Sequence, residues 1–84
     1  MNETVTRWSV EIYLSEIDGH THAEARLMSG LEPPLTTSGD ATLSEHDALD
    51  VAEVGFELAT ARALRSLADE LRRIANEDVA ALAG

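Results

Sequence analysis

Three side chains that could hold a metal ion stand at alternate positions, His20, His22 and Glu24. In an extended strand alternate residues share one face, so two imidazoles and a carboxylate would point the same way. Zinc accepts such ligands, but a closed site needs four. No fourth ligand is evident, and histidines are ordinary on exposed strands. We therefore predict no metal ion and no cofactor.

Other catalytic arrangements are not specified by the sequence. Serine, threonine, aspartate and glutamate are plentiful, so many triads can be imagined, and no spacing selects one of them. A catalytic carboxylate would need a second titratable group and a pocket, neither of which is indicated. There is also no glycine-rich loop that could cradle a phosphate. We predict that the protein is not an enzyme and has no catalytic residues.

Glu57 is the charged residue with the least ordinary position. On a helix it falls beside Ala61, Leu64 and Ala68, where an unpaired carboxylate would be costly. Three alternatives remain open. Glu57 lies at the rim of the apolar side, it forms an ion pair with an arginine such as Arg26, or it pairs with a partner chain.

Four arginines gather on the other side of the same segment, interleaved with acidic residues: Arg62, Arg65, Arg72 and Arg73. As a phosphate-binding stripe this set is weak, because it is small and partly neutralised. The favoured interpretation is a solvated helix face with ion pairs between neighbouring turns. The alternative is an interaction surface.

The element that positions these residues is the stretch from about 51 to 75. Apolar residues recur there at steps of three and four, which is the period of an amphipathic helix. We predict that this helix covers a sheet with that stripe, that Asn76 interrupts it, and that a short helix follows at about 77–82. The stripe comprises Val54, Leu58, Ala61, Leu64, Ala68, Leu71 and Ala75.

The residues before the helix predict three strands, at about 7–15, 21–28 and 35–43. The first alternates apolar and polar residues, and Asp18-Gly19 after it is typical of a tight hairpin turn. The loop 29–34 contains two prolines, which separate the second strand from the third. The sequence thus predicts a single α+β domain over 1–84, β-β-β-α, with a three-stranded antiparallel sheet covered on one face by one long helix. Small residues on both layers predict that helix and sheet approach closely.

Charge and length restrict the partners. Sixteen acidic residues oppose six arginines, for a net charge of −10, which disfavours free nucleic acid and anionic membranes and favours a basic protein. No segment has the length and apolarity of a signal peptide or a membrane span, so we expect a cytoplasmic protein. An 84-residue chain without cysteine has little core and no disulfides, and we expect it to form a homodimer.

Two stretches together resemble a family of small actinobacterial proteins of unknown function, RWSVEIYLSEIDGHTHAEARL at 7–27 and VAEVGFELATARALRSLADEL at 51–71. The family includes a hypoxia- and dormancy-induced mycobacterial protein that is similar to ribosome hibernation factors. The resemblance implies a double-stranded-RNA-binding-domain-like fold, a homodimer, and a role in stress or dormancy.

Residues and resemblance together predict a non-catalytic, stress- or dormancy-associated regulatory module that acts through protein contacts. The alternative is a ribosome- or RNA-associated hibernation-type factor. The acidic charge argues against that alternative, because a ribosomal RNA surface is strongly negative.

Overall fold

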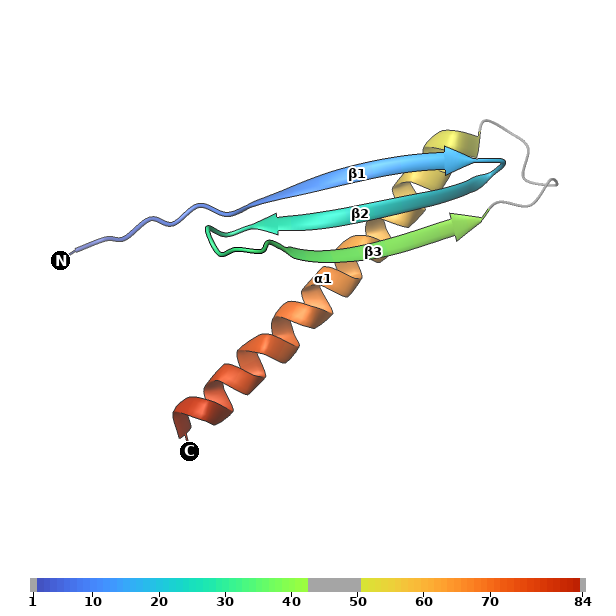
Figure 1. The fold of residues 1–84 in the computed structure, drawn as a ribbon. Coiled ribbons are helices and arrows are strands. Elements are labelled where there is room, and N and C mark those ends of the chain that lie inside the picture. Colours follow the sequence, from blue (N-terminus) through green and yellow to red (C-terminus); the bar gives the residue numbers. More distant parts are fainter. Residues whose placement is uncertain (1, 43–50, 84) are drawn as a thin grey trace.

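The computed structural model describes residues 2–42 and 51–83, and it has one sheet and one long helix (Figure 1). The strands are β1 (Ser9–Ile17), β2 (His20–Met28) and β3 (Leu35–Thr42), and the helix is α1 (Val51–Ala83). The strands are antiparallel in the order β1-β2-β3. The predicted α+β class and strand order are confirmed. Residue 43, predicted to end the third strand, and the connector to residue 50 lie outside the described residues.

A two-residue turn sets the register of the first two strands. Asp18 and Gly19 both have positive φ, 49° and 79°, as a mirror-image hairpin turn requires. Ile17 then pairs with His20, and the ladder runs without a break to Ser9 and Met28. The predicted hairpin is confirmed.

The separate helix predicted at 77–82 is wrong, because α1 continues through Asn76 to Ala83. Asparagine inside a helix costs only a few tenths of a kcal/mol, about 0.7 at most, and local contacts can offset this. Such contacts are present, since Arg73 forms ion pairs with Glu70 one turn earlier and with Glu77 one turn later. The pair between Arg73 and Glu77 spans the position at which an interruption was expected.

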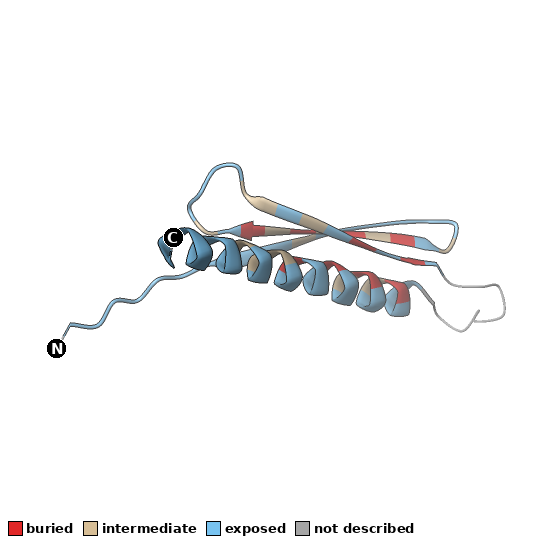
Figure 2. Ribbon diagram, turned by 90° about the horizontal axis from the view of Figure 1, so that it is seen from below, coloured by how far each residue is buried: buried red, intermediate tan, exposed pale blue. Residues whose placement is uncertain are grey.

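The core between helix and sheet is built mainly from alanine. Its buried apolar members are five alanines and two leucines, and the largest side chain with almost no exposure is that of Thr21. In Figure 2 the buried segments of α1 are confined to the half that lies against the sheet. The buried apolar residues are Ala23, Ala25, Leu27, Ala41, Ala59, Ala63 and Leu67.

Helix and sheet approach closely at Gly39 on β3. A Cβ placed there would lie 2.4 Å from the backbone nitrogen of Ala63 and 2.6 Å from the carbonyl oxygen of Ala59. Beside it, the Thr37 hydroxyl donates a hydrogen bond of 2.8 Å to the Ala63 carbonyl. The predicted close packing of small residues therefore holds on the sheet side.

The helix side of that prediction is wrong. α1 presents Ala59, Ala63 and Leu67 to the sheet, whereas most of the predicted stripe is exposed, including Val54, Leu58 and Leu64. The physical reason is the close approach of the α1 backbone to Gly39, at Ala59 and Ala63, which leaves no room for a larger side chain on the helix at this contact. Leu71 of the predicted stripe packs partly against the core, and Leu67, which was predicted to widen the stripe, is buried in it.

No helix within the described residues is both long enough and apolar enough to span a lipid bilayer.

Candidate interaction surface

The inner face of β1 is apolar and poorly covered. Val10, Ile12 and Leu14 stand opposite Leu27, Ala25 and Ala23 in the ladder, so they share the face that carries α1. Yet Val10 is 41% exposed and Leu14 43%. Figure 1 shows the reason: α1 begins behind the carboxyl end of β1 and runs obliquely past β2 and β3. Because α1 crosses the strands obliquely, it leaves much of the inner face of β1 uncovered.

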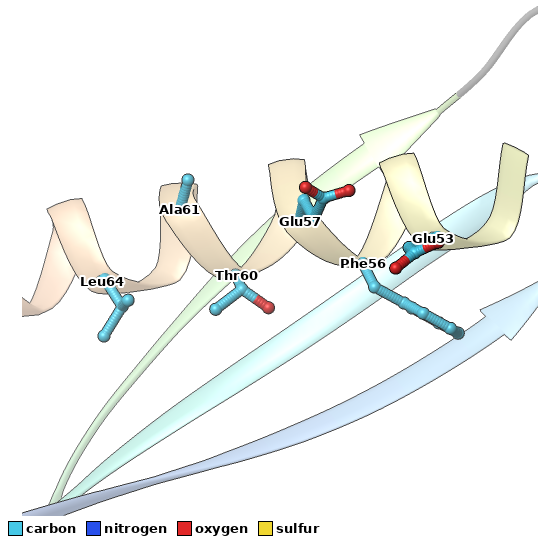
Figure 3. A pocket seen from close by; sticks show the side chains of 6 residues that line it. All are labelled: Glu53, Phe56, Glu57, Thr60, Ala61 and Leu64. Carbon is cyan, nitrogen blue, oxygen red and sulfur yellow. The ribbon is translucent and has the colours of Figure 1, made fainter.

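The flank of α1 that faces β1 is also open. On the opposite flank, Arg62 donates a hydrogen bond of 2.6 Å to the carbonyl of Asp40 on β3. Leu64, two positions further along the helix, therefore points away from β3. A hollow of about 530 Å³ lies along this flank (Figure 3), and its lining residues are Glu53, Phe56, Glu57, Thr60, Ala61 and Leu64.

We call these two adjoining regions the open apolar surface, defined by Val10, Ile12, Leu14, Phe56, Ala61 and Leu64. The sequence prediction missed it because it assumed that the strand's apolar face and the helix's apolar stripe cover each other. The sequence did contain a signal of this surface. Leu67 and Ile74 make the apolar side of the helix wider than a contact with one sheet requires.

A second hollow, of about 460 Å³, lies near the other end of the sheet. It is bounded by Trp8, by the loop 29–34 and by Leu71 and Ile74 of α1. Trp8 and Leu31 are both strongly exposed. This hollow places the proline-containing loop beside apolar helix residues.

The outer face of the sheet carries the histidines. The Nδ1 atom of His22 lies 2.8 Å from Oδ1 of Asp40, and Nε2 of His20 lies 3.1 Å from the same oxygen. The other ring nitrogen of His20 is 2.9 Å from the Thr42 hydroxyl. Glu24, the third ligand considered from the sequence, pairs instead with Arg26. Across residues 2–42 and 51–83, no group of three histidine or acidic side chains has an arrangement that could hold a metal ion.

Hydrogen bonding from His22 lowers the pKa of Asp40, with a smaller contribution from His20. Because the folded carboxyl has the lower pKa, its contribution to stability is present above the unfolded pKa of about 4 and is lost as the pH falls through the folded value. We expect His22→Ala to raise the pKa of Asp40 towards its ordinary value. An NMR titration of the side-chain carboxyl measures this, with Glu70, whose pKa is lowered by Arg73, as the internal control. An unchanged Asp40 titration would contradict the assignment.

The ion pair considered between Glu57 and Arg26 within one chain is wrong. Arg26 lies on the outer face of β2, where its Nε donates a hydrogen bond of 2.7 Å to Glu24. Its guanidinium stacks on the ring of Tyr13, 4.3 Å from the centroid. Glu57 is exposed on α1, which packs on the inner face. The sheet therefore separates the two side chains, and Glu57 has the rim position that was the first alternative.

The arginines of α1 do not form one continuous stripe. Arg62 binds the β3 backbone, and Arg73 is held by Glu70 and Glu77. Arg65 and Arg72 are exposed. Two of the four are thus committed to contacts within the chain, as the solvated-face interpretation expects.

A small three-stranded sheet and one long oblique helix define the class of protein, an elongated α+β module with an exposed apolar face. The Rv2632c-like family model matches residues 6–84, and the chain belongs to that family.

Related proteins and a solved structure agree with this assignment. The chain is 35% identical over 81 residues to the uncharacterized protein Mb1767 of Mycobacterium bovis, and equally to the uncharacterized protein MT1780 of Mycobacterium tuberculosis. Each match covers 96% of this chain and 84% of the relative. The crystal structure of Rv2632c matches with a TM-score of 0.84 and 33% identity, over 96% of this chain and 94% of that one.

Proposed function

We propose that this protein is a non-catalytic homodimer that works in the cytoplasm as a stress- or dormancy-associated regulatory module and acts through protein contacts. The observation that supports a homodimer is the contrast between the core and the surface of the single chain. The core is mostly alanine, whereas the large apolar side chains of β1 and α1 are exposed.

The energetic argument rests on side-chain size. Burying a methyl group contributes about 0.8 kcal/mol, and fully burying a valine, leucine or phenylalanine contributes about 1.5–3 kcal/mol. Five of the seven buried apolar residues are alanines, so the single chain realises little of this energy. Val10, Leu14 and Leu64 of the open apolar surface would contribute it on burial against a second copy. A chain of 84 residues has few other sources of stability, since it contains no cysteine.

The outer face of the sheet supports the contact with other proteins. Tyr13 and Met28 are exposed there, on the side away from the open apolar surface, so they stay accessible in a dimer that uses that surface. A net charge of −10 on each chain steers basic proteins towards the molecule. The dormancy role and the likeness to a double-stranded-RNA-binding domain rest on the resemblance of residues 7–27 and 51–71.

Sedimentation velocity over a range of concentrations tests the homodimer. We expect a species of twice the 9.0 kDa chain mass, with dissociation only on strong dilution. Monomer at every concentration would overturn the homodimer.

The same preparation, sedimented with intact ribosomes at low and at higher salt, separates protein contacts from the ribosome-associated alternative. We expect no co-sedimentation. Binding that fades with salt and is weakened in an Arg65→Ala, Arg72→Ala double variant would favour the ribosome instead.

A further inference from the structure

We propose that two copies of the chain join along β1, with the two strands antiparallel, Ile12 of one copy opposite Ile12 of the other, and the open apolar surface enclosed between them. This inference rests on the proposed homodimer and specifies its geometry. It makes one six-stranded sheet with both helices on the same face.

The first support is the state of the β1 edge. β1 pairs on one side only, with β2, and its nine-residue ladder to β2 is unbroken. Of the usual devices that prevent edge pairing, β1 lacks proline, lysine, bulges and short length, and its charged residues are limited to Glu11 and Glu16. Its free edge can therefore accept another strand.

The second support is the contrast with β3, the other edge. α1 packs mainly on β3, where Gly39 and Ala41 are already buried. A second copy joined at β3 would gain backbone hydrogen bonds but would cover little further apolar surface. Joined at β1, it also covers Val10, Ile12 and Leu14, so the hydrophobic contribution selects this edge.

The third support is that the surface is self-complementary. In an antiparallel pair centred on Ile12, Val10 of one copy lies opposite Leu14 of the other, and all of these side chains point to the inner face. Because α1 begins near the carboxyl end of β1 (Figure 1), each helix start would lie beside the first half of the other copy's β1, which carries Val10. A two-fold axis thus brings together Val10 and Leu14, which are both exposed in the single chain.

The charges permit this arrangement despite the net −10 of each chain. Val10, Ile12 and Leu14 carry no charge, and Glu11 points to the outer face. In the proposed register Glu11 of one copy lies opposite Tyr13 of the other, so like charges do not face each other across the new strand pair. The remaining repulsion comes from the net charge of each chain and from Glu53 and Glu57, which line the hollow on α1. Added salt screens this repulsion and therefore tightens the dimer.

The absence of cysteine makes a direct test possible. A single cysteine at Ile12 in the full chain would face its counterpart at a Cα separation of about 4.5–5.5 Å, which suits a disulfide. We expect Ile12→Cys to become a covalent dimer under mild oxidation. Ser38→Cys, exposed on β3, is the control and should stay monomeric on a denaturing gel. Crosslinking of Ser38→Cys in place of Ile12→Cys would overturn the β1 geometry.

A second pair of variants does not depend on disulfide chemistry. Val10→Asp places a charge in the proposed interface and should weaken dimerisation by about 100-fold or more. Val5→Asp, at a strongly exposed position before β1, should leave it unchanged. Circular dichroism confirms that both variants are folded. If the wild-type chain is a dimer and Val10→Asp dimerises as tightly, the geometry fails while the homodimer stands. If the wild-type chain is a monomer, both proposals fail together.

Discussion

Replacing Gly39 with alanine lowers the free energy of unfolding by about 3 kcal/mol or more, one of the two largest effects that we expect from a single substitution. The new methyl group would meet backbone atoms of α1, at 2.4 Å from Ala63 and 2.6 Å from Ala59, and the Cβ of Arg62 at 2.7 Å. Backbone atoms cannot rotate away as the end of a side chain can. The helix would have to move off the sheet, and the hydrogen bond from Thr37 to Ala63 would stretch with it.

Chemical denaturation at one protein concentration measures this effect, and Gly30→Ala is the matched control. Gly30 has a φ of +87° but nothing within 4 Å of an added Cβ, so its substitution tests backbone strain without crowding. We expect that variant to lose only about 1–2 kcal/mol. Equal losses in both variants would show that conformational strain, and not the close approach of the helix, governs Gly39.

Leu67→Ala is the second large effect, with an expected loss of about 3 kcal/mol. Leu67 is 4% exposed and packs in the core, so its removal leaves a cavity between α1 and the sheet. Leu64, one turn earlier, is the same residue type at 41% exposure. Leu64→Ala should cost the folded chain about 1 kcal/mol or less under conditions in which it is monomeric.

Comparing the Leu67→Ala and Leu64→Ala variants tests which face of the helix packs on the sheet. The measurement is the denaturation midpoint of each variant at low protein concentration. A larger loss for Leu64→Ala than for Leu67→Ala would restore the stripe predicted from the sequence. At higher concentration the Leu64 variant should lose more stability than it does when dilute, because Leu64 belongs to the surface proposed to meet a second copy.

The strands and the hairpin could be predicted because their determinants are local. Alternation in β1 and the Asp18-Gly19 turn each depend on neighbouring residues, and both were placed correctly to within about two residues. The same turn sets the ladder pairs of Glu11 with Arg26 and of Tyr13 with Glu24. Asn76 was given too much weight, because the ion pair between Arg73 and Glu77 spans it and supports the helix there.

The face of α1 could not be predicted because it depends on a non-local fit. Two apolar stripes are available on this helix, one rich in leucine and one containing Ala59 and Ala63. Periodicity favours the larger residues, whereas the space above Gly39 accepts only the smaller ones. The contact of His20 and His22 with Asp40 was also missed, since Asp40 reaches them only through the pairing of β2 with β3.

The length of α1 gives the molecule two levels of local stability within a single helix. At 1.5 Å per residue its 33 residues span about 50 Å, whereas a nine-residue strand spans about 30 Å. The turns up to Leu67 are bound to the sheet, so their backbone amides are released only when the whole domain opens. The last turns, in which residues 75–83 are all exposed, can fray and re-form by themselves. Unfolding of the chain therefore proceeds from the carboxyl end of α1 towards the contact at Gly39.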